Sequence, residues 1–550
     1  MSNNLINTAM SGLNAAQAAL STASNNISNV TTAGYNRQTA VISQNTGTNT
    51  AQGYIGNGVV TNGVNREYNQ FIVNQLRSAS TTNSALTSYY NQVSQIDDLL
   101  SDSTNSLSTT MQTFFSNLQS MVSNPGDDAA RQTVLGSAQG LANQFQSTDK
   151  YLKDMESGVN QQISDNVDLV NNYAKQIATL NSQISRARGA AGSEPNALLD
   201  QRDQLVSELN DVVGVSVTQQ DGDTMNISVA GGLMLVQGSN AYSLEAVPSS
   251  SDPSRLTIGY NRGNGTNEVP ESQLTTGTLG GLLTFRSDSL DPARNQLGQL
   301  AVTMADQFNQ IHEAGYDLEG DAGGAFFSFT GPTTLGNVKN SGTADMTAVY
   351  TDTTKVQASD YTLKYSGSSW SVTRVSDGAA ISATSGTDSD GNPSLSFDGV
   401  SVSVSGTPAM GDSFTLKTVS NAAGSFEVAI TDSSKIAAAS EATSGVSDNR
   451  NAQKLLDLQT SKVVQGKTTL SGAYASLVSD VGNQTSAAKL NNTTQGNIVT
   501  QLTAQQQSIS GVNLDEEYGD LQRYQQYYLA NAQVIQTAGT IFNALMDLRG

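Results

Sequence analysis

The sequence predicts a multidomain protein of the α plus β class. A long helical bundle or coiled coil is built from both chain termini, and two mainly-β domains are inserted into it. All nine prolines of the 550-residue chain fall between Pro125 and Pro408, so both ends can form uninterrupted helices. Heptad spacing of apolar residues marks both ends, whereas two interior segments alternate polar and apolar residues as β-strands do. The chain is also too long for a single hydrophobic core, so we expect three or four domains.

Both chain ends carry apolar residues at the 3-4 spacing that buries one face of a helix against another helix. The N-terminal repeat alternates large residues with alanine, which lets a partner helix approach closely. Its members are Ile6, Ala9, Leu13, Ala16, Leu20, Ala23, Ile27 and Val30. The C-terminal repeat is Leu521, Tyr524, Tyr528, Asn531, Ile535, Ala538, Phe542 and Leu545, with a second row of Tyr527, Val534, Ile541 and Leu548.

The opposite faces of these helices decide between two interpretations of the repeats. The first is an ordinary intramolecular helix pair, which would expose Lys and Glu to water. Residues 1–36 and 524–546 contain no charged residue at all and carry Asn, Gln, Ser and Thr instead. Such faces can pack against copies of themselves without like-charge repulsion, so self-assembly is the favoured interpretation. We predict that the self-assembly interface contains Ile6, Leu13, Leu20, Ile27, Leu521, Tyr528, Ile535, Phe542 and Leu545.

Between the ends, the pattern changes several times. Residues 34–70 are rich in Gly and Asn and indicate loops with short strands. Helical spacing returns over 71–122 and 128–188, then after Ser193–Pro195, where proline can occupy the first turn of a helix. It recurs at about 288–314 and again at about 447–507.

Two segments alternate in strand fashion, residues 214–285 and about 335–435, with Gly, Asp and Ser at the turns. They share no internal repeat, which argues against a solenoid. The expected domains are 1–36 with 510–550 as a terminal coiled-coil assembly domain, 37–213 with 286–330 and 436–509 as a helical rod domain, 214–285 as a first β domain and 331–435 as a second.

Composition excludes several classes of function. A net charge of −21 opposes binding to nucleic acid or anionic lipid, which needs clustered Lys and Arg. The chain has no cysteine, so disulfides, thiolate catalysis and cysteine-based metal sites are excluded. The first twenty residues lack the basic and continuous apolar regions of a secretory signal peptide. No stretch of about 18 apolar residues predicts a membrane span.

The single histidine, His312, is the natural test of an enzyme hypothesis. The segment His-Glu-Ala-Gly-Tyr that it begins lacks the second histidine of a zinc-protease helix, and no G-x-S-x-G elbow supplies a serine nucleophile. A packing or surface role for His312 is therefore the favoured interpretation. No catalytic residue is predicted.

Two acidic segments resemble calcium loops, but neither has the required spacing. In Asp317-Leu-Glu-Gly-Asp321 the turn position that needs Gly holds Ala322, and in Asp388-Ser-Asp-Gly-Asn392 the glycine comes one residue early. Neither segment has the bidentate Glu twelve residues after its start. Both are interpreted as solvated turns. Gly56-Asn-Gly58 lacks the third glycine and the strand–helix setting of a dinucleotide loop, so no metal or cofactor is predicted.

The two ends resemble the terminal motifs shared by flagellar rod, hook and hook-associated proteins. The marks are the N-terminal heptads followed by Asn25-Asn26-Ile27-Ser28-Asn29 and Thr32-Ala33-Gly34-Tyr35-Asn36-Arg37-Gln38, and the matching C-terminal segment 510–549. Interior segments resemble the hook-associated members in particular: Asn69–Arg77, Leu199–Leu205 and Gly280–Arg286. The resemblance covers essentially the whole chain and is weakest over about 335–435.

This resemblance implies a structural subunit that forms a ring between hook and filament and is needed for filament assembly. The helical ends would line a central channel and the β domains would face outward. The implied partners are copies of itself, the hook protein, a second junction protein and a cytoplasmic export chaperone. That chaperone would cover about 510–550, including Leu521, Tyr528, Val534 and Ile541. Export would follow the flagellar type III route, without a cleavable signal peptide, to an extracellular position.

Three alternatives remain open at this point. The first is the hook protein or another axial protein of the flagellum. The second is a secreted peptidoglycan hydrolase with helical export ends, and the third is an adhesin whose β domains form the ligand surface. The interior segments argue against the hook protein. A hydrolase needs a defined carboxylate pair or metal site, and the sequence singles out neither.

Overall fold

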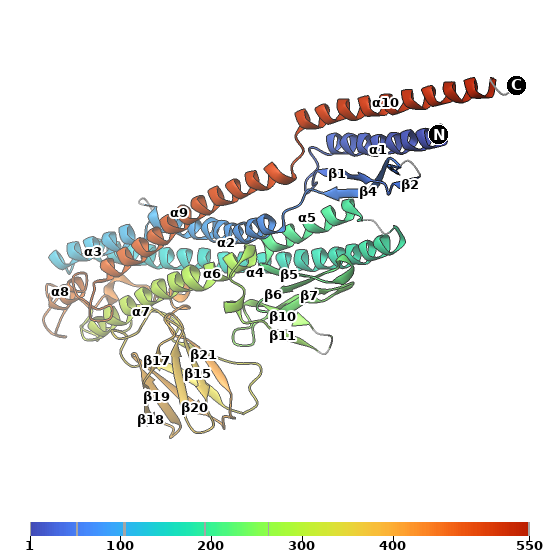
Figure 1. Cartoon of the computed structure of the whole chain (residues 1–550). Helices are drawn as coiled ribbons and strands as arrows, with labels where there is room; N and C mark the ends of the chain where they lie inside the picture. Colours follow the sequence, from blue (N-terminus) through green and yellow to red (C-terminus); the bar gives the residue numbers. More distant parts are fainter. Residues whose placement is uncertain are drawn as a thin grey trace.

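The protein is an elongated helical body with a pair of terminal helices at one end and β-sheets along one side (Figure 1). The computed structural model describes residues 2–50, 53–102, 106–191, 194–261, 263 and 265–547, except for the side chains of residues 2, 3, 50, 191 and 545. None of the described helices combines the length and the hydropathy that crossing a membrane requires.

Ten α-helices are described, and the longest of them sets the length of the body. They are α1 (Ser2–Ser28), α2 (Gln70–Ser101), α3 (Leu107–Ser123), α4 (Asp128–Ala191), α5 (Asn196–Val212), α6 (Gly277–Phe285), α7 (Asp291–Glu313), α8 (Arg450–Asp457), α9 (Leu470–Ser510) and α10 (Leu514–Asp547). Helix α4 has 64 residues. At a rise of about 1.5 Å per residue it extends roughly 95 Å.

The apolar face of α4 forms one side of the main core. Val159, Ile163, Val170 and Ile177 follow helical spacing and are completely buried against neighbouring elements. At the end of the body away from the chain termini, phenylalanine rings fill the space between α3 and α7. The ring centroids of Phe114 and Phe308 lie 5.6 Å apart. Edge-on and tilted aromatic contacts of this kind add to the stability gained from burial.

The first group of strands packs directly on the helical body. It contains β5 (Val215–Gln219), β6 (Met225–Val229), β7 (Leu233–Gln237), β8 (Asn240–Ala241), β9 (Ser243–Pro248), β10 (Leu256–Asn261) and β11 (Thr266–Glu268). They form two antiparallel sheets, ordered β5-β6-β7-β8 and β11-β10-β9. Ile227, Leu235 and Ile258 belong to the same buried cluster as Val170 of α4. The two sheets therefore share one continuous core with the helices.

The second group of strands has a core of its own. It contains β13 (Thr333–Gly336), β14 (Asp345–Tyr350), β15 (Tyr361–Tyr365), β16 (Trp370–Arg374), β17 (Ala380–Ile381), β18 (Thr384–Thr387), β19 (Pro393–Phe397), β20 (Val400–Ser405) and β21 (Ser413–Lys417). The sheet orders are β13-β21-β15-β16-β17 and β14-β20-β19-β18. Their shared core includes Tyr361, Val402 and Leu416, and Val302 of α7 completes it. This module thus packs on the body through part of its own core.

The remaining strands are short. They are β1 (Gln38–Gln44), β2 (Thr48–Thr50), β3 (Gly53–Ile55) and β4 (Val59–Arg66) beside α1, and β12 (Phe327–Ser328) with β22 (Glu427–Val428). Strands β1 and β4 pair in antiparallel register and pack against α1. This places a small sheet under the N-terminal helix (Figure 1).

Two sequence expectations are wrong at their edges. Strand structure expected through residue 285 ends at β11, and residues 277–285 form α6 instead. Leu279, Leu282 and Leu283 are buried, while Gly281 lies so close to α2 that a Cβ there would be 2.2 Å from the Ala85 carbonyl oxygen. The helix expected over 447–507 is also broken, since residues 458–469 separate α8 from α9.

Candidate self-assembly surface

The two terminal helices lie side by side and antiparallel, so that the start of α1 and the end of α10 lie on the same side of the molecule (Figure 1). Small residues line the contact on α1: Ala9, Ala16 and Ala23 are each less than 5% exposed, as is Ala538 of α10. Gly12 faces Asn531, where an added Cβ would lie 2.5 Å from the amide oxygen. The alternation of large residues with alanine therefore allows the close approach that the sequence predicted.

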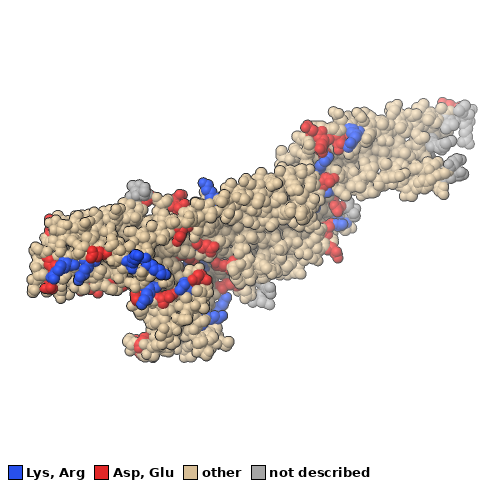
Figure 2. Space-filling model, turned by 60° about the vertical axis from the view of Figure 1, so that its left-hand side comes forward, with Lys and Arg blue, Asp and Glu red and all other residues tan. Residues whose placement is uncertain are grey.

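Along the edge of this contact, α10 leaves apolar side chains open to solvent. Tyr527 is 53% exposed, Val534 38% and Ile541 48%. Leu529, Phe542 and Met546 are also exposed. Figure 2 shows that the terminal pair carries charged side chains at its base and few beyond it. Several exposed apolar side chains on an uncharged helix are typical of an interaction site.

The predicted interface residues divide between these two surfaces. Ile6, Leu13, Leu20, Ile27, Leu521 and Ile535 are half-buried on the two terminal helices. Tyr528 and Phe542 are exposed, and the Leu545 side chain lies outside the described residues, as does all of Leu548. Of the residues predicted for chaperone binding, Tyr528, Val534 and Ile541 are exposed and Leu521 is half-buried. The intramolecular pair thus uses one stripe and leaves another free.

A buried polar joint, which the sequence analysis missed, fixes the base of the terminal pair. Asn26 is 1% exposed and accepts hydrogen bonds from the Tyr35 hydroxyl at 2.7 Å and the Gln38 N–H at 3.0 Å. Its amide donates to the Gln38 carbonyl at 2.9 Å and to Glu517 of α10 at 3.1 Å. Arg37 adds an ion pair with Glu517 at 2.8 Å. The joint therefore connects the end of α1 with the start of α10.

Asn36, which directly precedes Arg37, connects the polar joint to the helical body. Asn36 donates to Asp200 of α5 at 2.6 Å. Arg66 of β4 bridges Asp200 at 2.9 Å and Asp203 at 3.0 Å. Burial raises the pKa of Asp200, although hydrogen bonds from Arg66 and Asn36 oppose that shift. Burial, together with the charges of Asp200 and Glu517, raises the pKa of Tyr35 to about 12, so Tyr35 stays a neutral hydrogen-bond donor.

Two cavities flank the loop between α1 and β1. One, of about 650 Å³, lies between this loop, α2, α5 and the end of α9. The other, of about 730 Å³, lies between the loop and the facing surfaces of α4 and α5. Charged residues reappear in the sequence at Arg37 and over 515–523, directly beside the uncharged ends. That placement indicates paired charges at the base of the terminal pair, but it does not identify the buried partners of Asn26.

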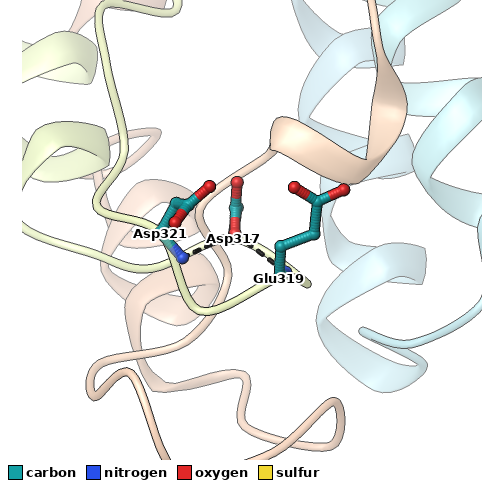
Figure 3. A group of neighbouring side chains, drawn as sticks. All are labelled: Asp317, Glu319 and Asp321. Carbon is teal, nitrogen blue, oxygen red and sulfur yellow. Dashed lines mark hydrogen bonds between the residues drawn. The ribbon is translucent and has the colours of Figure 1, made fainter.

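Among the described residues, one cluster of three carboxylates is compact enough to be tested as a metal site: Asp317, Glu319 and Asp321 (Figure 3). Lys435 contacts all three, at 3.0, 2.6 and 3.2 Å. Asp317 accepts the N–H groups of Glu319 and Asp321. Burial raises the pKa of Asp317, but these bonds and Lys435 outweigh it and leave the pKa below its ordinary value. The residues form an ion-paired turn that a lysine already neutralises.

The second acidic segment forms a turn of the same kind. The Asp388 carboxylate accepts the N–H groups of Asp390 at 2.9 Å and Asn392 at 2.8 Å. This geometry is an Asx-type turn at the hairpin between β18 and β19. One carboxylate oxygen accepts these two backbone N–H groups, and the other accepts the Asn392 side-chain amide at 3.1 Å.

His312 is buried and fully hydrogen-bonded. Its Nδ1 lies 2.7 Å from the Gly324 carbonyl oxygen, and its Nε2 accepts the Ala437 N–H at 2.9 Å. This pairing defines the neutral tautomer that carries its proton on Nδ1. Burial lowers the pKa of His312. The side chain therefore joins α7 to the segments around Gly324 and Ala437, and both of its nitrogens are engaged.

Three stretches of the chain match models of known protein families. Residues 93–327 match the helical domain of flagellar hook-associated protein FlgK, and residues 335–418 match the D2-like domain of flagellar hook-associated protein 1. Residues 6–36 match the flagella basal body rod protein family. The first match covers α3 to α7 with the strands β5 to β11, the second covers the second β module, and the third covers most of α1.

Full-length relatives show the same similarity. The flagellar hook-associated protein 1 of Escherichia coli is 57% identical over 99% of this chain and all of its own length. That of Salmonella typhimurium is 55% identical over the same shares. The solved structure of the flagellar hook junction protein FlgK from Burkholderia pseudomallei, 31% identical, matches with a TM-score of 0.75. It covers 80% of this chain and 100% of that chain.

Proposed function

The chain belongs to the flagellar hook-associated protein 1 family, and from that membership we propose that its copies form a ring at the junction between hook and filament, held by their terminal helices. It is a structural junction protein located in the flagellum. The ring, its contacts and its route of export are the parts that we propose.

One observation carries the proposal for the contacts: α10 exposes an apolar stripe on a helix that has no charge from residue 524 to residue 546. A lone helix in water with such a stripe is only marginally stable. Burial of the stripe against neighbouring copies would contribute about 25 cal/mol per Å² of apolar area. The half-buried residues Ile6, Leu13, Leu20 and Ile27 would set the geometry of the pair, while Tyr528 and Phe542 contact other copies.

We extend the proposal to partners and export. The hook protein lies below the ring and a second junction protein lies above it. Before export through the flagellar type III apparatus, a cytoplasmic chaperone covers residues 510–550. The exposure of Tyr528, Val534 and Ile541 supports this, because an uncovered apolar stripe promotes aggregation.

We also propose that the protein acts without catalysis and that it divides as the sequence suggested. The terminal pair is 1–36 with 510–550, and the rod is 37–213 with 286–330 and 436–509. The β domains are 214–285, of which residues 277–285 form α6, and 331–435. The carboxylate of Asp317 is ion-paired, and both ring nitrogens of His312 are hydrogen-bonded. These contacts support a structural role for the polar groups of the body. The separate core of the second β module supports the last boundary.

The test is complementation of a null strain with full-length variants. Val534→Glu and Ile541→Glu place charges on the open stripe and leave the packed alanines intact. We expect stable, exported protein, hooks without filaments and flagellin shed into the medium. Asn172→Asp, which adds a charge at an exposed position of α4, is the matched control and keeps normal filaments. Normal motility of both stripe variants would contradict the proposal.

A further inference from the structure

The second half of α9 forms an exposed helical surface next to the terminal pair. Residues 489–509 include no buried side chain, although the flanking Ala488 and Ser510 are buried. This half of the helix is held against α2 by two polar contacts. Thr87 donates to Asn492 at 2.7 Å, and Gln495 donates to the Ala79 carbonyl at 3.0 Å. Its remaining surface faces outward.

This surface, residues 489–509 of α9, is almost without charge. Lys489 is the one charged residue in the sequence between Asp480 and Asp515. Helix α4 of the same molecule shows the ordinary pattern, with Lys150, Asp154, Asp165, Asp168 and Lys175 on its exposed side. In Figure 2 a wide uncharged area covers the upper side of the body next to the terminal pair, where Figure 1 places α9. A helix face that contacts only water can carry charged side chains, as α4 does. The lack of charge on the α9 face therefore indicates a role other than contact with water.

Several exposed side chains of this face can lose their water contacts without leaving a hydrogen-bond donor unpaired. Thr493, Thr494 and Thr500 each donate their hydroxyl hydrogen to the carbonyl four residues earlier, at 2.9 Å. These donors are therefore satisfied within the helix and need no water partner. Leu490 is 68% exposed, Ile498 41% and Ile509 39%. The face thus combines apolar groups, internally bonded hydroxyls and neutral amides, which can both donate and accept.

We infer that this face of α9 is a docking surface for a second copy of the chain, separate from the contact made by the terminal helices. The inference rests on the proposed ring. Each copy carries a net charge of −21, so a neighbouring copy approaches with least repulsion where charge is absent. A neutral face that fits neutral amides of an identical protein meets this condition.

The position of the face relative to the terminal pair supports the choice of occupant. The carbonyl of Ser510, the last residue of α9, accepts the Arg37 N–H at 2.8 Å. Arg37 in turn pairs with Glu517 of α10. The α9 face therefore ends at the polar joint from which the terminal helices leave. Packing between the terminal helices of adjacent copies would bring the helical bodies of those copies together on the side that carries the α9 face. Contacts that repeat in this head-to-tail manner close a ring.

The absence of cysteine makes a direct test possible. Asn497→Cys on α9 and Asn172→Cys on α4, both exposed, each receive a photoactivated benzophenone maleimide in full-length protein assembled into flagella. We expect the Asn497 probe to form an adduct with the mass of two copies and the Asn172 probe to form none. Labelling of Asn497→Cys by a polyethylene glycol maleimide should fall several-fold between free monomer and flagella. The labelling rate at Asn172→Cys should stay unchanged.

Two results would overturn the inference. One is equal labelling of Asn497→Cys in monomer and flagella, or equal protection at both positions. The other is an adduct with a different axial protein, which would identify another occupant. Failure of the proposed function is read separately: in that case unmodified protein is absent from purified hook–filament junctions. If it is present there and Asn497 remains accessible, the α9 inference alone fails.

Discussion

Two fully paired polar side chains hold segments together that are distant in sequence. His312 joins α7 to Gly324 and Ala437, and Asn26 joins α1 to Gln38 and Glu517. In both, every hydrogen-bonding atom has a partner, so burial carries no penalty for unpaired groups. The same completeness makes each site sensitive to substitution or to a change of protonation.

His312 predicts a loss of stability in mild acid. Its pKa is lower in the folded chain than in the unfolded chain, because burial disfavours the charged form and the nearby Arg131 opposes it further, while Asp317 and the Gly324 carbonyl favour it. The unfolded state therefore binds more protons below the ordinary pKa of about 6.5. Stability from this group is complete above that pH and is lost as the pH falls below it.

The measurement is chemical denaturation of wild type and His312→Gln from pH 5 to pH 8. The difference in unfolding free energy between the two proteins should shrink as the pH falls, since other titrating groups cancel in the comparison. At neutral pH we expect the variant to be less stable by about 1–3 kcal/mol if the Ala437 N–H loses its partner. A difference that is constant with pH would contradict the prediction.

Asn26→Leu is expected to loosen the base of the terminal pair. It leaves the buried Gln38 N–H without a partner, at a cost of about 1–3 kcal/mol, and it removes the bond to Glu517. Hydrogen exchange should accelerate over 29–38 and 514–520 and stay unchanged in α4. Asn14→Leu is the matched control, because Asn14 is an exposed residue of the same helix. Equal effects of the two variants would refute the role of the joint.

At the scale of elements, the long helices of this chain have very different support. Helix α4 buries a continuous apolar stripe in the main core, whereas α10 buries only Glu517 and Ala538 among its described side chains. Long helices gain most of their stability from packing. The terminal helix therefore depends on partners that the single chain does not supply.

We predict that α10 exchanges its amide hydrogens faster than α4 in the purified monomer. Residues 524–546 should exchange early in a hydrogen-exchange time course at low protein concentration, because few side chains hold that segment. Residues 159–177 of α4, fully packed, should be protected longest and serve as the internal control. Strong protection of both segments would contradict this prediction.

At the scale of the whole molecule, the second β module is separate in its core but attached by several contacts. Lys417 pairs with Asp252 at 2.6 Å, and Gln299 of α7 donates to the Val356 carbonyl at 2.6 Å. Val302 of α7 lies inside the core of the module. Removing the module therefore exposes a part of the body that is otherwise dry.

Replacement of residues 335–418 by a short Gly/Ser bridge should leave assembly largely intact and weaken filaments under shear. This range keeps Phe426, which is buried in the main core. Exposure of Val302 costs about 1.5–3 kcal/mol, a reduction that a long helical body tolerates. A second deletion that also carries Val302→Thr should recover solubility, because it removes the exposed apolar group. The measurements are swimming and filament counts after shearing in a complemented null strain. Stable, exported protein that builds no filaments would show that the module belongs to the assembly core.

The sequence by itself determined the helical ends, the two strand-rich segments and the family. Heptad spacing and strand alternation are local patterns, so each can be recognised from residues that are close together in the sequence. It also separated the uncharged termini from the acidic body. It misplaced residues 277–285, because Leu279, Leu282 and Leu283 form a short apolar run that fits a buried strand or a buried helix equally well.

Only the tertiary structure decided which polar residues are buried together. Asn26 and Glu517 lie almost five hundred residues apart along the chain and 3.1 Å apart in space, and no local pattern connects them. The same holds for Lys435 and Asp317, and for His312 and Ala437. Periodicity identifies the face that a helix buries, but the partner of each buried polar group depends on the packing of elements that fold together from distant parts of the chain.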